Sequence, residues 1–227
     1  MALILQLETA TQVCSVALAR DGVTIGLKEL QSPNIHASSL TLFIKEVMEQ
    51  CEVSFADLNA IAVSKGPGSY TGLRIGVSTA KGLCFALDKP LIGISTLEMM
   101  AKGWLEKNSG YGGLVCPMID ARRMEVFSAV YDNSLNVVEP ISAKIIDEGS
   151  FAQFLDDNAI TFIGDGADKC RVSITNPKAF FDTENYNSAA NMSALAHAAY
   201  TAGKFEDVAY FEPFYLKDFV FTTPKKK

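Results

Sequence analysis

The order of strand-like and helix-like segments along the chain limits its fold more than any other feature. Residues 3–7 form an apolar run, and residues 13–19 carry apolar side chains at alternate positions, as strands do. Asp21-Gly22 separates this second segment from residues 23–30, and such a dipeptide between two apolar runs favours a two-residue hairpin. The chain therefore opens as an antiparallel meander of three strands.

The same order begins again in the second half of the sequence. The first meander is followed by helical patterns near 36–51, 69–87 and 97–104, which alternate with strand patterns at 58–64 and 91–94. Residues 108–113 contain three glycines and form the best linker, and residues 114–119, 125–131 and 137–146 then form a second series of three strands. We predict an α/β fold of two similar halves, 1–107 and 108–227, each with a mixed sheet that starts β-β-β and is flanked by helices. The shared order of elements suggests an internal duplication.

The composition is that of a folded, acidic protein. The 227 residues are 48% hydrophobic and 20% charged, which excludes wholesale disorder. The net charge of −6 gives no overall basic field to attract nucleic acid. The N-terminal residues lack a basic stretch and a long apolar run, and the five cysteines are scattered singly, so we expect a cytoplasmic protein without disulfides or a membrane span.

Catalytic and metal-binding patterns are missing from the sequence. The only two histidines are His36 and His197, and neither has a second ligand at metal-binding spacing or the context of a nucleophile elbow. We expect His36 to be a surface residue at a helix start and His197 to pack in an alanine-rich helix. The sequence therefore predicts no catalytic residue and no metal site in this chain.

The segment from Lys65 to Gly76 is the most informative in the sequence. It places several glycines directly before and within the start of a helix, where free N–H groups can bind an anion and where glycine permits close backbone approach. Two interpretations stay open, phosphate contact and tight packing. The candidates for phosphate or nucleotide contact are Gly66, Gly68, Ser69, Thr71, Gly72 and Arg74.

The helix predicted at 69–87 is almost wholly apolar, and the helix predicted at 36–51 has an apolar stripe. Such helices are buried on more than one side, either within their own domain or against a partner.

Asp120-Ala-Arg-Arg-Met-Glu125 also leaves two interpretations open, because its adjacent arginines can bind phosphate or pair with carboxylates across a sheet edge. The three lysines at 225–227 are most simply a solvated tail.

Several segments together resemble the TsaB (YeaZ) family, bacterial subunits of tRNA threonylcarbamoyladenosine biosynthesis. They are residues 4–9 and 14–18, the glycine-containing segment 65–82, Pro90 to Glu98 and Ile119 to Arg123, with looser likeness at 164–166 and 213–216. The resemblance implies an actin-like (ASKHA) fold, which agrees with the repeated order of elements. Tyr70 stands where many members have Phe, and the lysine tail is not a family feature.

The resemblance also implies a role. It points to a non-catalytic adaptor that pairs with the metal-dependent transferase TsaD, is joined by the ATPase TsaE, and pairs with itself when alone. ATP or ADP and a metal are then expected in the partner subunits, and tRNA meets this chain through the complex. The interface implied by the first two helices comprises His36, Leu40, Phe43, Ile44, Val47, Gly76, Thr79 and Leu83.

Enzyme functions remain as the alternative. An ASKHA-type ATPase would use the loops 66–72 and 164–166, with Glu8 as the candidate acidic residue. A peptidase is the weaker version, since the sequence offers no credible pair of nucleophile and base.

Overall fold

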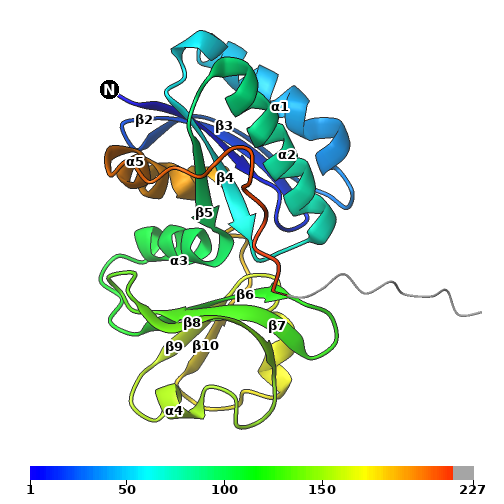
Figure 1. The fold of residues 1–227 in the computed structure, drawn as a ribbon. Coiled ribbons are helices and arrows are strands. Elements are labelled where there is room, and N and C mark those ends of the chain that lie inside the picture. The colour runs from blue at the N-terminus through cyan, green and yellow to red at the C-terminus, as the bar shows by residue number, and fades with distance from the viewer. Residues whose placement is uncertain (217–227) are drawn as a thin grey trace, which may run out of the picture.

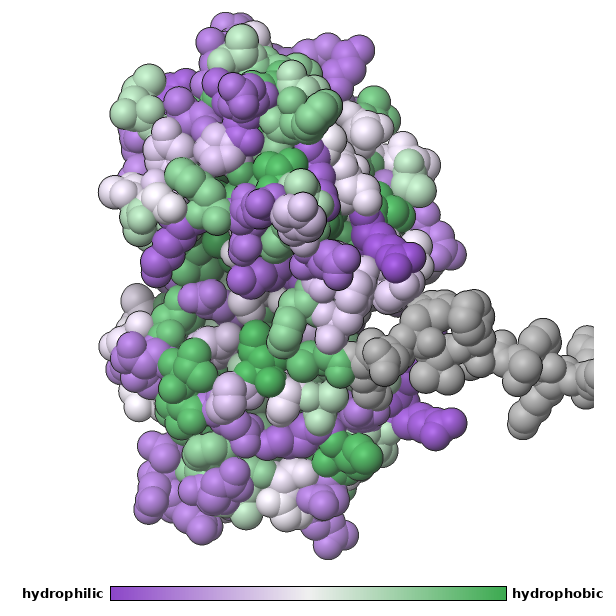
Figure 2. Space-filling model, in the orientation of Figure 1, coloured by the Kyte–Doolittle hydropathy of each residue, from purple (hydrophilic) through white to green (hydrophobic). Residues whose placement is uncertain are grey.

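The computed structural model describes residues 1–216, and the lysine-rich tail predicted to be solvated lies outside them. Two five-stranded sheets form the two halves of the molecule, which lie one above the other in Figure 1 and, in the same orientation, in Figure 2. The first sheet has the order β3-β2-β1-β4-β5, and the second has the order β8-β7-β6-β9-β10. In each, three antiparallel strands are followed by two parallel ones, so the predicted repetition is confirmed.

The strands before residue 150 lie close to the predicted segments. Those of the first sheet are β1 (Leu3–Glu8), β2 (Val13–Arg20), β3 (Val23–Gln31), β4 (Ala60–Gly66) and β5 (Leu91–Ser95). Those of the second sheet are β6 (Leu114–Asp120), β7 (Glu125–Tyr131), β8 (Val137–Ile145), β9 (Ile160–Ile163) and β10 (Ala179–Asp182). Asp21 and Gly22 both have positive φ, +49° and +82°, as a type I′ hairpin turn requires.

The helices cover the sheets unequally. The α-helices are α1 (His36–Gln50), α2 (Tyr70–Leu87), α3 (Thr96–Lys107), α4 (Ala152–Leu155) and α5 (Ser193–Thr201), and the 3₁₀ helices are η1 (Phe55–Asp57), η2 (Asp168–Val172) and η3 (Ala189–Met192). In Figure 1, α1 and α2 lie side by side over one face of the first sheet, and α3 lies between the two sheets. No helix among residues 1–216 is long and apolar enough to cross a bilayer.

The chain returns to the first sheet after it has built the second. Helix α5 packs on β1, β3 and β5, and Glu206 forms an isolated bridge with Leu91 of β5. We call residues 204–216 the C-terminal strap. Phe211 of the strap is buried in the core under α1 and α2, and Lys81 of α2 donates hydrogen bonds to the carbonyl oxygens of Ala209 and Phe211 at 3.2 and 2.9 Å. The residues after β10 therefore complete the first half.

Candidate functional site

The glycine-containing segment connects β4 to α2 at the carboxyl edge of the first sheet. Ser69 is the N-cap of α2, and its Oγ accepts a hydrogen bond from the Gly72 N–H at 3.3 Å. The Ser69 N–H in turn donates to the Ala10 carbonyl oxygen at 2.6 Å. The start of α2 is thereby fixed against the loop that joins β1 to β2.

Close contact with that loop explains the glycines of α2. A Cβ atom on Gly72 would lie 2.1 Å from the Thr9 carbonyl oxygen, and one on Gly76 would lie 2.2 Å from Thr9 Oγ1. Thr9 Oγ1 also donates to the Gly72 carbonyl oxygen at 2.8 Å. The tight-packing interpretation is therefore confirmed for these two glycines, while contact with phosphate stays a prediction.

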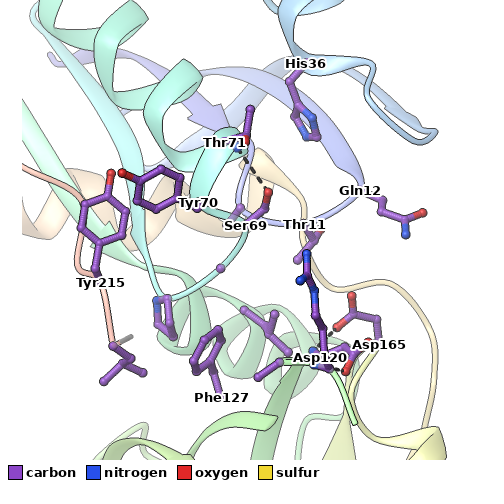
Figure 3. A pocket seen from close by; sticks show the side chains of 18 of the residues that line it. Thr11, Gln12, His36, Ser69, Tyr70, Thr71, Asp120, Phe127, Asp165 and Tyr215 are labelled. Carbon is purple, nitrogen blue, oxygen red and sulfur yellow. Dashed lines mark hydrogen bonds between the residues drawn. The ribbon is translucent and has the colours of Figure 1, made fainter. Parts of the chain in front are cut away.

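A cavity of about 960 Å³ lies between the two halves at this point. Figure 3 shows Thr11, Gln12 and Ser69 on the wall from the first half, and Asp120, Phe127 and Asp165 on the wall from the second. Of the predicted phosphate-contact residues, Gly68, Ser69, Thr71 and Gly72 line the cavity. Gly66 does not, because it faces the strap, where its Cβ would lie 2.8 Å from the Phe214 carbonyl oxygen.

Glu8 lies at the end of β1 and has no solvent-exposed surface. One carboxylate oxygen accepts a hydrogen bond from the Ala10 N–H at 2.5 Å. Burial raises the pKa of Glu8 to about 7, although hydrogen bonds from the surrounding backbone and from Ser64 act in the opposite direction. This side chain therefore changes its charge near neutral pH.

The turn between β6 and β7 forms the opposite wall, and sequence reasoning left its role open. Lys169 contacts the Asp120 carboxylate and donates to the carbonyl oxygens of Arg123 and Glu125 at 2.7 Å each. Asp165 accepts a hydrogen bond from the Asp120 N–H at 3.1 Å. Arg122 and Arg123 line the cavity, and neither forms an ion pair with a described residue. The predicted arginine–carboxylate pairing is thus not seen in residues 1–216, where Lys169 takes the place of the arginines beside Asp120.

Two tyrosines, Tyr70 and Tyr215, line the edge of the cavity, and together with Arg74 they form what we call the lip, which was not predicted from the sequence. Tyr70 and Tyr215 are neighbours in Figure 3, and their ring centres are 4.9 Å apart. The guanidinium of Arg74 lies 4.2 Å from the centre of the Tyr70 ring. Arg74 Nε donates to the Tyr215 hydroxyl at 3.2 Å. Arg74 therefore lies beside the cavity, bound to the strap, and the only sequence signal for this contact was the weak likeness at residues 213–216.

The side chains expected at a partner interface lie mostly in the core of this chain. Leu40, Phe43, Ile44 and Val47 are at most 5% exposed and pack on the first sheet. Gly76 is buried against Thr9, and only Thr79 and Leu83 keep partial exposure. Pairing through α1 and α2 stays a prediction, but a partner would meet the outward residues of these helices, including Leu42 and Phe85 at 50% and 86% exposure.

The two histidines have structural surroundings. His36 is buried, not on the surface as expected, and its Nε2 donates to the Val13 carbonyl oxygen at 3.0 Å. His197 is half-buried on α5 and touches the Gly22 turn. No group of three His, Cys, Asp or Glu side chains that could hold a metal ion occurs within residues 1–216.

Comparison with known proteins places the chain in a family. The model of the TsaD family, described as tRNA N6-adenosine threonylcarbamoyltransferase, matches residues 31–221. The chain belongs to this family. Among curated relatives, the tRNA threonylcarbamoyladenosine biosynthesis protein TsaB of Escherichia coli K12 is 41% identical over 133 residues, and its namesake in Bacillus subtilis 168 is 33% identical over 138 residues. These alignments cover 59% and 61% of this chain but only 56% and 58% of the relatives.

Solved structures extend the likeness over nearly all of the chain. YeaZ from Pseudomonas aeruginosa has a TM-score of 0.84 and 26% identity over 95% of this chain and 100% of its own. A polyphosphate/ATP-glucomannokinase from Arthrobacter has a TM-score of 0.51 and 12% identity over 88% of this chain and 100% of its own, which shows the fold alone. Together with the two duplicated sheets, these members of the family and fold confirm the actin-like ASKHA architecture.

Proposed function

We propose that this chain is a subunit of the machinery that forms threonylcarbamoyladenosine in tRNA, next to the anticodon, and that it acts in the cytoplasm. The observation that carries the proposal is the identity of 41% and 33% shared with two relatives named TsaB. The match to YeaZ over the full length of that structure supports it. Because the curated alignments span little more than half of each relative, the activity and partners of those proteins are proposals for this chain.

The proposed role is that of a non-catalytic adaptor. The chain would pair with a TsaD-type transferase, be joined by the ATPase TsaE, and pair with itself when the transferase is absent. The metal and the ATP or ADP would then lie in the partner subunits. The local chemistry of residues 1–216 supports that division: the His36 ring nitrogen donates to a backbone carbonyl, and no ion pair with the buried Glu8 is found among these residues.

The pair α1 and α2 is the surface that we assign to the partner. Their inward residues fix the two helices on the first sheet, so the helices present a rigid outer face. On α2 this face carries Ser78, Gly82 and Phe85, and a Cβ on Gly82 would meet no atom within 4 Å. Small residues beside one exposed aromatic ring suit the close approach of another helix.

The decisive experiment is mass spectrometry of tRNA nucleosides from cells depleted of this chain. We expect threonylcarbamoyladenosine to fall while other modified nucleosides stay constant, and a plasmid copy of the chain to restore it. An unchanged level would overturn the proposal.

A stand-alone ATPase is the second candidate. The cavity between the two halves and the shared fold of a kinase that uses ATP favour it. Calorimetry of the isolated chain with ATP and Mg²⁺ separates the two functions: heat of binding at micromolar ATP favours the ATPase, and no heat favours the adaptor. The peptidase alternative has less support, because His36 is held by a backbone carbonyl and not by a nucleophile.

A further inference from the structure

We infer that the cavity between the halves binds the phosphate backbone of an RNA strand, with Arg122 and Arg123 as its cationic clamp. The inference rests on the proposed function, which brings the chain to tRNA, and it adds a direct contact that an adaptor role does not require. Four structural features carry it.

The first feature is that both guanidinium groups are available. Arg122 and Arg123 are exposed at the cavity wall, and no ion pair with either is found among residues 1–216. The nearby carboxylates of Asp120 and Asp165 are bound to Lys169 and to the Asp120 N–H. Adjacent arginines without carboxylate partners can bind phosphate oxygens in the bidentate geometry that guanidinium favours.

The second feature is a turn held in an unusual backbone conformation. Arg122 and Arg123 both have positive φ, +71° and +53°, which is unfavourable for a side chain of this kind. Three sets of hydrogen bonds hold the conformation. Lys169 donates to two carbonyl oxygens of the turn, and the Asp120 carboxylate accepts a hydrogen bond from the Arg122 N–H at 2.9 Å. The Ala121 N–H donates to the carbonyl oxygen of Glu125. Strain of this kind is typically kept where side chains must point in a particular direction. Lys169 is thus a positioning residue for the arginines.

The third feature is the opposite wall, which presents hydrogen-bond donors rather than carboxylates. Gln12, Ser69 and Thr71 line the cavity there, beside the N-terminus of the long helix α2 (Figure 3). The helix dipole is positive at this end, so it adds to the attraction that the arginines exert on an anion.

The fourth feature favours a strand over a small anion. Outside the arginine turn, the lip offers the ring of Tyr215 and the stacked pair of Arg74 and Tyr70, on which an unpaired base can stack. A ligand that meets both the turn of the second half and the lip of the first half must be extended.

The test measures binding of an unmodified tRNA transcript to the full chain by fluorescence anisotropy, at several salt concentrations. The variant is Arg122→Asn with Arg123→Asn, because asparagine tolerates positive φ and the fold is retained. We expect about tenfold weaker binding, and a slope of log K against log salt that is smaller by about 1.4, or about 0.7 for each phosphate contact to a single strand. Arg20→Asn is the matched control, since Arg20 is exposed at the far end of β2 and should change neither quantity.

Three results would overturn the inference. They are unchanged RNA binding in the double variant, no binding of the transcript by the full chain at 50 mM salt, and displacement of the transcript by ATP at micromolar concentration, which would assign the arginines to a free nucleotide. The proposed function is judged separately: threonylcarbamoyladenosine lost on depletion, but kept in cells that carry the double variant, refutes the RNA clamp and leaves the adaptor role intact.

Discussion

The indole N–H of Trp104 donates a hydrogen bond to the Asp182 carboxylate at 2.9 Å, which joins α3 of the first half to the end of β10 in the second. The same carboxylate oxygen accepts the Tyr186 hydroxyl at 2.7 Å. None of these three residues lines the large cavity. The bonds therefore join the two halves on a different side of the junction from the cavity.

Loss of Asp182 should loosen this side of the junction. Burial alone would raise the pKa of Asp182, but hydrogen bonds from Glu184 N–H, Tyr186 and Trp104 outweigh it and lower the pKa below 3.8. The carboxylate therefore contributes stability that is complete above the unfolded pKa and is lost as the pH falls through the lower folded pKa. We expect Asp182→Ala to reduce the unfolding free energy by about 1.5–3 kcal/mol at pH 7 and by less at pH 3.

Urea denaturation at the two pH values measures this effect, with Glu184→Ala as the control. Glu184 is mostly exposed and pairs with Lys107 at 3.4 Å, so its loss should cost about 1 kcal/mol or less. If the two variants lose the same unfolding free energy, the hydrogen bond between Trp104 and Asp182 contributes no more to stability than an exposed ion pair does.

Glu8 should make the protein less stable as the pH rises from about 4.5 to 7. In this window the folded state keeps a proton, because the folded pKa is about 7, while the unfolded carboxylate near 4.5 has lost it. Glu8→Gln removes this difference, and its unfolding free energy at pH 8 should exceed that of the unchanged chain by up to roughly 3 kcal/mol. Thermal melting of both proteins between pH 5 and 8 provides the measurement, and parallel melting curves across that range would contradict the assignment.

Two glycines of α2 should respond in opposite ways to the same substitution. Gly72→Ala places a methyl group 2.1 Å from the Thr9 carbonyl oxygen, so the loop or the helix must move, at about 1–3 kcal/mol. Gly82→Ala meets open space and gains helix propensity, which should stabilise the protein by about 1 kcal/mol. Chemical denaturation of both variants distinguishes packing from propensity, and a loss at Gly82 equal to that at Gly72 would refute the packing argument.

Local patterns predicted most of the fold. The period of two in residues 13–19 and the Asp21-Gly22 turn depend on neighbours in sequence, and both are found in the structure. The repeated strand order followed from them. Strand β10 was not predicted, because its four residues carry no clear period and its pairing with β9 is a tertiary contact.

The site depends on contacts that a single sequence does not display. An apolar stripe such as Leu40, Phe43 and Val47 indicates burial but not the surface that covers it, and here the covering surface is the chain's own sheet. The strap reaches Arg74 from more than 130 residues away in sequence, and Lys169 similarly organises a turn more than 40 residues earlier. Residue types alone suggested anion contact at both places, but the arrangement of the walls required the fold.

Phe85→Glu should separate partner binding from folding. The Phe85 ring is 86% exposed on α2, so a charge there costs the isolated chain little, whereas it would be buried without a counterion in an interface between helices. We expect the variant to melt as the unchanged chain does and to lose co-elution with a TsaD-type partner in gel filtration. Val172→Glu, at 79% exposure on η2 of the other half, is the matched control and should retain the complex. Val47→Glu is unsuitable, since Val47 has no exposed surface and the charge would unfold the first half instead. A complex that survives Phe85→Glu and Leu42→Glu together would exclude the outer face of α1 and α2 as the partner surface.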